Sequence, residues 1–295
     1  MTLLRRLIVL PSSVMLFAGC QEPSPDPEIE RLSSMQSKIR EKAAGKLLLF
    51  GERVVPRLIE ETDSELIRVR FEVARILGRI KDPRATDALI ELLNDSSFNV
   101  AQYAAWGLGE IQAPAAVPEL LRHTQSVSKG FRGQVIRALG SCYDDNVHAE
   151  LRDSIHTIVK GALRDSTPDV RISALLSARH LGYRVMTEEV IRMSRDPSAK
   201  VRHVAVQALG QLAVGDAPRS LGPVSVRTRT NIVEALMLSL EEPMQSIRTK
   251  AVRSLEKIGA QAAIPALERL LKTGTDKDQR EARRVLEGLQ ATAAS

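Results

Sequence analysis

The sequence repeats itself about every 31 residues, and this repeat limits the possible folds more than any other feature. The apolar residue that opens each copy recurs every 30 or 31 residues, apart from two longer steps of 39 and 46 residues. The copies open at Ile39, Val69, Val100, Phe131, Val170, Val201, Ile247 and, in a degraded last copy, Asp278. Such a period is typical of solenoids, in which each copy buries its apolar face against its neighbours.

Within each copy, aliphatic residues recur with the spacing of one helix face. Positions 0, 4, 8 and 11 are apolar in nearly every copy, and these offsets lie on one side of a helix. A shorter amphipathic segment, such as residues 83–93, lies between successive copies of this helix. Glycines nine or twelve residues after the opening residue predict the left-handed turn that ends a helix. We therefore predict an all-α fold, a right-handed α-solenoid of about eight stacked helical hairpins over residues 35–292.

The repeat also resembles a known family. The pattern Asp-x-x-x-x-Val-Arg-x-x-Ala-x-x-Ala-Leu-Gly, followed by Asp-Pro-x-Ala-x-x-x-Leu-x-x-Leu-Leu, is similar to short HEAT repeats of the phycobilisome-lyase type. The matching residues are Asp196, Val201, Arg202, Ala205, Ala208, Leu209 and Gly210 for the first part, and Asp82, Pro83, Ala85, Leu89, Leu92 and Leu93 for the second. The resemblance implies a HEAT superhelix. It also implies one functional alternative, a bilin-lyase-like protein that acts on a chromophore or a phycobiliprotein-type partner.

The first 19 residues predict a signal peptide. Arg5 and Arg6 precede a largely apolar run over residues 7–18, which is shorter than the ~20 residues that span a bilayer but suits a signal peptide. The run ends in Leu-Phe-Ala-Gly-Cys at residues 16–20, which resembles the bacterial lipobox. That resemblance implies cleavage before Cys20 and acylation of Cys20. A plain secretory signal and a buried N-terminal helix remain alternatives.

The signal peptide is followed by a segment rich in proline and acidic residues. Three prolines fall within residues 22–28, so we predict an extended, solvated tether over residues 20–34. Residues 35–292 then form the solenoid and residues 293–295 a tail. This order predicts a lipid-anchored protein of the cell envelope, at the outer membrane or the periplasmic face if the cell is Gram-negative.

An acidic residue precedes an arginine by six positions in several copies. The pairs are Asp165 with Arg171, Asp196 with Arg202, and Glu242 with Arg248. These residues could form an anion site. The interpretation that we favour is a structural ladder, in which each acid caps its helix and pairs with a neighbouring arginine. The third copy has Ala101 at the arginine position, so the ladder should be interrupted there.

The motifs of common enzymes do not occur. The sequence contains no P-loop, no Gly-x-Ser-x-Gly and no His-Glu-x-x-His, and its five histidines are scattered singly without a following Glu. Cys142 occupies a core position, which predicts an inert buried thiol. Without Arg5 and Arg6 the chain has 40 basic and 36 acidic residues, a net charge of +4 that is small for a nucleic-acid binder. We therefore expect no enzyme activity, cofactor, metal or small-molecule substrate, and no binding to nucleic acid.

A candidate binding surface follows from the helical offsets. Positions 3, 6 and 10 should face the concave groove, where Tyr103 and the single tryptophan, Trp106, lie between Arg75 and Arg137. Trp, Tyr and Arg dominate protein–protein hot spots, so we predict another protein as the partner. Trp106 could instead pack between helices, and the basic loop over residues 214–230 is a second candidate surface. The leading hypothesis is a non-catalytic, lipid-anchored scaffold.

Overall fold

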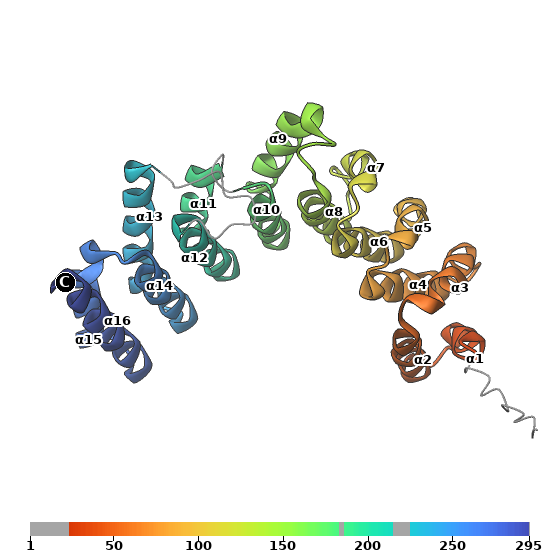
Figure 1. The fold of residues 1–295 in the computed structure, drawn as a ribbon, viewed down its shortest axis with the longest axis horizontal. Helices are drawn as coiled ribbons and strands as arrows, with labels where there is room; N and C mark the ends of the chain where they lie inside the picture. The colour runs from red at the N-terminus through yellow and green to blue at the C-terminus, as the bar shows by residue number, and fades with distance from the viewer. Residues whose placement is uncertain (1–23, 183–185, 215–224, 295) are drawn as a thin grey trace, which may run out of the picture.

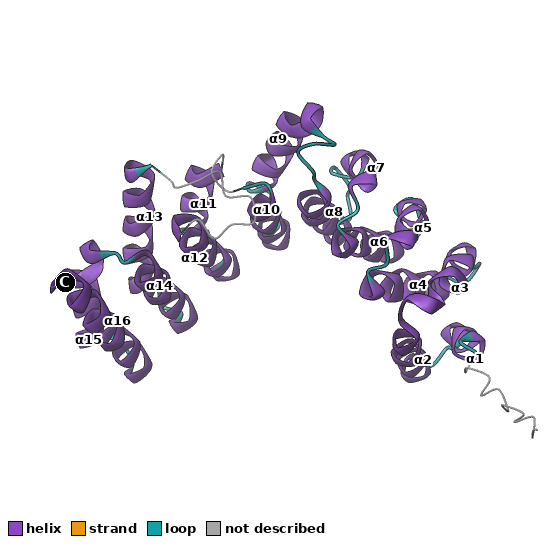
Figure 2. Cartoon of the chain, in the orientation of Figure 1, coloured by secondary structure: helices purple, strands orange, loops and turns teal. Residues whose placement is uncertain are grey.

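The computed structural model describes residues 24–182, 186–214 and 225–294. All regular secondary structure within these ranges is helical (Figure 2). The helices pair into eight hairpins that stack side by side into an arc (Figure 1). The predicted all-α solenoid is therefore confirmed, whereas the signal peptide and Cys20 lie outside the described residues.

Each hairpin contributes one outer and one inner helix to the arc. The outer helices are α1 (Asp26–Glu30), α3 (Val55–Glu60), α5 (Thr86–Leu92), α7 (Val117–Arg122), α9 (Arg152–Ala162), α11 (Thr187–Met193), α13 (Val226–Leu238) and α15 (Ile264–Thr273). The inner helices are α2 (Ser37–Phe50), α4 (Ile67–Ile80), α6 (Phe98–Ile111), α8 (Lys129–Cys142), α10 (Pro168–His180), α12 (Ala199–Val214), α14 (Gln245–Ile258) and α16 (Asp276–Ala294). The inner helices line the concave side (Figure 1).

The apolar positions of the repeat form one continuous core. Val100, Ala104 and Leu108 are buried in α6, and the equivalent residues are buried in the other inner helices with few exceptions. The first copy departs from the pattern, because Ile39 is 37% exposed at the beginning of α2. The core positions predicted from the spacing are thus largely confirmed.

The glycines nine residues after the opening residue have a different role from the one predicted. Gly78 lies inside α4, where a Cβ atom would stand 2.7 Å from the Cα of Gly107 in α6. These glycines therefore allow close contact between inner helices. Positive φ occurs instead at position 12, in Gly51, Gly182 and Gly259, and Gly259 adopts the predicted left-handed conformation at the end of α14. Two other residues at that position, Lys81 and Gln112, adopt positive φ as well.

The predicted tether is partly helical, which corrects the boundary at residue 35. Helix α1 covers Asp26–Glu30 and a 3-10 turn follows over Arg31–Ser33. The prolines permit this because Pro25 and Pro27 lie at the cap and in the first turn, where a missing N–H breaks no helical hydrogen bond. Ile29 and Leu32 are buried against the first inner helix, so the solenoid begins inside the supposed tether.

Candidate functional site

The acid–arginine pairs form a ladder along one edge of the arc. Arg171 in α10 donates to both carboxylate oxygens of Asp196, at 2.8 and 2.7 Å, and to the carbonyl oxygen of Asp165 at 2.8 Å. Asp196 also accepts a hydrogen bond from the backbone N–H of Ser198 at 2.8 Å, in the turn that precedes α12. The ladder pairs are Arg70–Asp95, Arg132–Asp165, Arg171–Asp196, Arg202–Glu242 and Arg248–Asp278. The pairing of the acids with neighbouring arginines is confirmed, and Ala101 interrupts the ladder as predicted. The predicted helix capping is not seen at α6 and α10, whose N-cap residues make no side-chain cap hydrogen bond.

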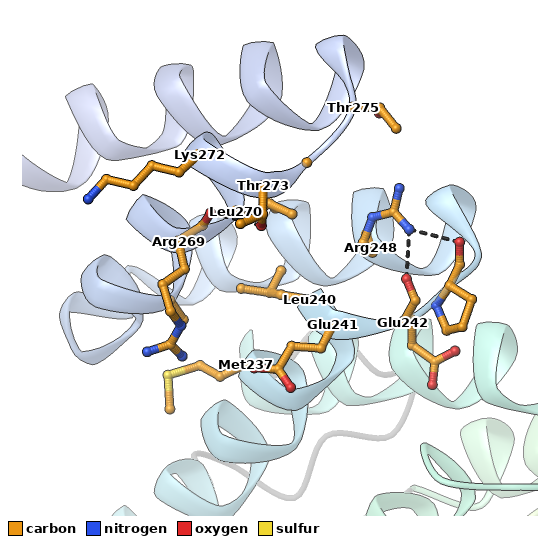
Figure 3. Close-up of a pocket in the computed structure, with 13 residues that line it drawn as sticks. Met237, Leu240, Glu241, Glu242, Arg248, Arg269, Leu270, Lys272, Thr273 and Thr275 are labelled. Carbon is orange, nitrogen blue, oxygen red and sulfur yellow. Dashed lines mark hydrogen bonds between the residues drawn. The ribbon is translucent and has the colours of Figure 1, made fainter.

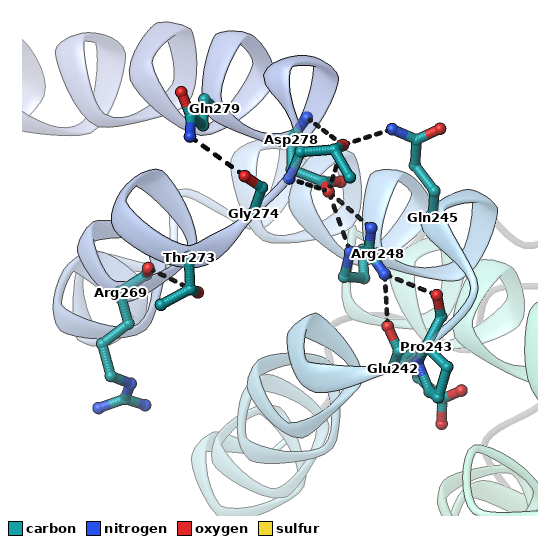
Figure 4. Close-up of polar contacts among 10 residues, drawn as sticks. Glu242, Pro243, Gln245, Arg248, Arg269, Thr273, Gly274, Asp278 and Gln279 are labelled. Carbon is teal, nitrogen blue, oxygen red and sulfur yellow. Dashed lines mark hydrogen bonds and ion pairs between the residues drawn. The ribbon is translucent and has the colours of Figure 1, made fainter.

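The ladder ends on a buried carboxylate in α16 (Figure 4). Arg248 Nη2 lies 2.6 Å from Asp278 Oδ2, and Arg248 Nη1 donates to the carbonyl oxygens of Glu242 and Pro243. Burial alone would raise the pKa of Asp278, but hydrogen bonds from Arg248 and Thr275 outweigh burial and lower it below its ordinary value. Asp278 therefore stays ionised, and its ion pair with Arg248 links α16 of the last hairpin to α14 of the hairpin before it.

A cavity of about 540 Å³ lies beside this ladder end, between α13, α14 and α15 (Figure 3). Its walls include Met237, Leu240 and Leu270, and its polar groups include Arg248, which the ladder already engages. A smaller cavity of about 310 Å³ recurs at the equivalent place between the 3-10 turn Glu61–Asp63, α4 and α5, again beside a ladder arginine, Arg70. The cavity is thus an enlarged form of a groove that the repeat creates, and it gathers no catalytic constellation.

The predicted aromatic pair does lie on the inner helix α6. The rings of Tyr103 and Trp106 meet edge to face with centroids 6.0 Å apart, and Phe71 packs on Tyr103 at 4.7 Å. A Cβ atom on Gly78 would stand 2.8 Å from the Trp106 ring, so the indole lies over α4. Trp106 is half-buried. It therefore packs against α4 and stays partly exposed to solvent.

Trp106 and Arg137 line one cleft on the inner helices α6, α8 and α10. The cleft has a volume of about 160 Å³, and its other polar wall residues include Lys81, Glu110, Gln112, Gln134, Ser141 and His180. Lys81 Nζ pairs with Glu110 Oε2 at 2.6 Å. Gln134 Oε1 is buried without a hydrogen-bond partner.

The structure brings together part of the predicted surface. Arg137 and Trp106 share the cleft, and Tyr103 contacts Trp106, but Arg75 is not among the cleft residues. Arg75 pairs instead with Glu72, with Nη2 and Oε2 2.6 Å apart. The sequence reasoning missed Lys81 and Gln112, which enter the cleft from the positive-φ position at the helix ends. The second candidate surface lies partly outside the described residues, and its last part, from Val226, belongs to α13.

Cys142 is buried, as predicted, and its Sγ lies 3.2 Å from the carbonyl oxygen of Leu108. Burial raises the pKa of the Cys142 thiol to about 12. Because the thiolate is the reactive form, we expect a Cys20→Ser variant to resist alkylation at about pH 8 when folded. The same variant should react once unfolded in urea. Mass spectrometry checks this, and rapid labelling of the folded protein would contradict it.

The described residues contain no group of three or more His, Cys, Asp or Glu side chains placed to hold a metal ion. Within the same ranges, no helix combines the length and the apolar character needed to cross a bilayer.

Family comparisons identify the repeats. The model described as HEAT repeats matches residues 26–100 and 86–158, the HEAT repeat model matches residues 187–215, and the PBS lyase HEAT-like repeat model matches residues 247–273. The chain thus contains HEAT repeats, among them one of the phycobilisome-lyase type.

One curated relative is phycocyanobilin lyase subunit alpha of Synechococcus elongatus, 34% identical over 85 residues. The match covers 26% of this chain and 31% of the relative, so it spans about a third of that protein.

Two solved structures share the fold. The complex of CpcE and CpcF of phycocyanin lyase from Nostoc aligns with a TM-score of 0.52 and 21% identity, covering 94% of this chain and 99% of the other. An engineered protein aligns with a TM-score of 0.52 and 20% identity, covering 90% and 78%.

These comparisons contradict the expectation that the chain is not an enzyme, because the named relative and the Nostoc structure are both parts of lyases. The absence of a P-loop, a Gly-x-Ser-x-Gly and a His-Glu-x-x-His motif excludes only those enzymes that depend on such a local motif. A helical solenoid that assembles a site from several repeats, or with a second protein, leaves no such motif.

Proposed function

We propose that the protein is a HEAT-repeat subunit of an enzyme of the bilin-lyase type, acting on a bilin chromophore together with a phycobiliprotein-type partner. The observation that carries the proposal is the 34% identity over 85 residues to phycocyanobilin lyase subunit alpha. The phycobilisome-lyase type of the repeat at residues 247–273 supports it.

The inner face of the arc is the proposed contact surface for a protein partner. Solenoids present an extended concave surface, and here that surface carries the aromatic pair Tyr103 and Trp106 next to Arg137. The cleft of about 160 Å³ is smaller than the roughly 300–1,000 Å³ of ordinary ligand pockets. A bilin would therefore need walls from the partner as well, which agrees with a lyase that works as a complex of two proteins.

Co-elution tests the partner. Full-length protein and apo-phycocyanin, mixed at about 10 µM each, should elute together on a sizing column if their Kd is micromolar or lower. Trp106→Ala should weaken the complex, whereas Val226→Ala, an exposed apolar residue on the outer helix α13, should not. Separate elution of the wild-type proteins would contradict the proposal.

We also infer that Cys20 carries a lipid anchor, because residues 16–20 resemble a lipobox. Cells grown with labelled palmitate should incorporate the label into wild-type protein and not into Cys20→Ser. Label that is absent from the wild type, or unchanged in the variant, would contradict the anchor. The outcome also decides in which compartment the partner must be sought, since phycobiliproteins are assembled inside the cell.

A further inference from the structure

Two inner-face arginines are neutralised within the chain, and a third at the same helix position is not. Arg75 in α4 pairs with Glu72 at 2.6 Å, and Arg253 in α14 pairs with Glu281 of α16 at 2.8 Å. Arg137 in α8 also stands six residues after the opening residue of its copy. Its guanidinium makes no ion pair with any described residue.

The sequence around Arg137 explains the difference. The carboxylate that pairs with Arg75 comes from three positions earlier in the same helix. The carboxylate that pairs with Arg253 lies in the next inner helix, three residues after the opening residue of that copy. The corresponding residues for Arg137 are Gln134 and Ser173. The two positions that supply a carboxylate to Arg75 and Arg253 are therefore both occupied by neutral residues next to Arg137.

The size of the cleft beside Arg137 suits one side chain. Its volume of about 160 Å³ equals that of about five water molecules at roughly 30 Å³ each. Among its walls, the cations Arg137 and Lys81 face the single carboxylate of Glu110, so these three side chains carry one net positive charge. A single carboxylate balances that charge, and the planar guanidinium fits a carboxylate with two parallel hydrogen bonds.

The unpartnered Gln134 points to a peptide rather than to a free anion. Gln134 Oε1 is a buried acceptor at the cleft wall that receives no hydrogen bond. Buried polar groups normally have partners, so the occupant should bring a donor as well as a carboxylate. A peptide segment brings both, because each acidic residue also carries a main-chain N–H.

We propose that this cleft receives an Asp or Glu side chain of the partner protein. The carboxylate pairs with Arg137, the main chain donates to Gln134, and a neighbouring apolar residue packs on Trp106. The inference rests on the proposed function in one respect, that a protein binds the inner face, and it adds the chemistry of the bound segment.

The chain provides its own reporter for a test. Trp106 is the only tryptophan, so all tryptophan fluorescence comes from a wall of the cleft. The probe is the acetylated and amidated peptide Leu-Glu-Leu-Ala, titrated at constant ionic strength and compared with its Gln counterpart. We expect a saturable change with the Glu peptide and at least about tenfold weaker binding of the Gln peptide. Equal responses, or none, would overturn the proposal.

Two variants and one control sharpen the test. Arg137→Ala should abolish the response, and Gln134→Glu should also block it, because the new carboxylate would occupy Arg137 as Glu72 occupies Arg75. Arg253→Ala, which removes an arginine with an internal partner, should respond as the wild type does. Binding retained in Gln134→Glu would overturn the proposal.

Inorganic phosphate serves as the second probe. An equal saturable response to phosphate would show a general anion site and would overturn the acidic-segment proposal. Co-elution with apo-phycocyanin separates the two hypotheses. Co-elution without a peptide response would overturn the cleft proposal alone, whereas a peptide response without co-elution would overturn the proposed partner alone.

Discussion

Arg248→Ala is expected to destabilise the C-terminal hairpin by about 3 kcal/mol, because it leaves a buried carboxylate without its partner. Asp278 is 1% exposed and Arg248 Nη2 stands 2.6 Å from it. The same arginine donates to two carbonyl oxygens in the turn before α14. Hydrogen exchange of the amides in α16 checks this, and about 3 kcal/mol corresponds to roughly 100-fold faster exchange through local opening.

Arg253→Ala is the matched control for this prediction. Arg253 also lies in α14 and also pairs with a carboxylate of α16, but its side chain is 56% exposed. Exposed pairs contribute about 0–1 kcal/mol, so this variant should exchange nearly as the wild type does. Equal effects of the two substitutions would contradict a specific role for the buried pair.

The effect of Arg248→Ala should depend on pH. The pKa of Asp278 is lowered in the folded protein, whereas an unfolded Asp titrates near about 3.9. The carboxylate therefore contributes its stability above about pH 4, and this contribution is lost as the pH falls through the lower folded pKa. The difference in urea midpoint between wild type and variant should be smaller at about pH 3 than at pH 7. A larger difference in acid would contradict the assignment.

Gly78→Ala is expected to destabilise the protein by about 1–3 kcal/mol, because the inner helices have no room for an added methyl group. The new Cβ would stand 2.7 Å from the Cα of Gly107 and 2.8 Å from the Trp106 ring. Backbone atoms cannot rotate away, so α4 and α6 must separate. The thermal midpoint measures the effect, and tryptophan fluorescence should change with it.

Gly45→Ala is the control, because Gly45 also lies within an inner helix, α2, but has no atom within 4 Å of the added Cβ. Alanine is the better helix former by about 0.8–1 kcal/mol, so this variant should be slightly more stable than the wild type. The two substitutions should thus shift the midpoint in opposite directions. An increase for Gly78→Ala would contradict the close contact of α4 with α6.

The sequence predicted those features that depend on local spacing. Val100, Ala104 and Leu108 share a buried face because three or four residues make one helical turn, whatever the neighbouring helix is. The ladder was predictable for a similar reason, since an acid stands six residues before the arginine in three copies, as Asp196 does before Arg202.

Features that depend on neighbouring helices were not predictable in the same way. Gly78 looked like a helix end, but its role is set by Gly107 in the next inner helix. The start of the solenoid was misplaced because proline was treated as excluding helix, although Pro25 and Pro27 stand at the start of α1. That Arg137 lacks a carboxylate partner becomes visible only when α8 and α10 are known to be neighbours. Ser173 then stands where Glu281 stands relative to Arg253.

Covalent attachment of phycocyanobilin to apo-phycocyanin tests the proposed lyase activity most directly. The full-length protein would be incubated with both substrates and, in turn, with each protein of the Nostoc complex. Bilin that stays bound after denaturation would be read from its absorbance. The account predicts attachment above the protein-free background when this chain replaces one of the two lyase proteins, and its loss in Trp106→Ala. Background attachment in every combination would contradict the account.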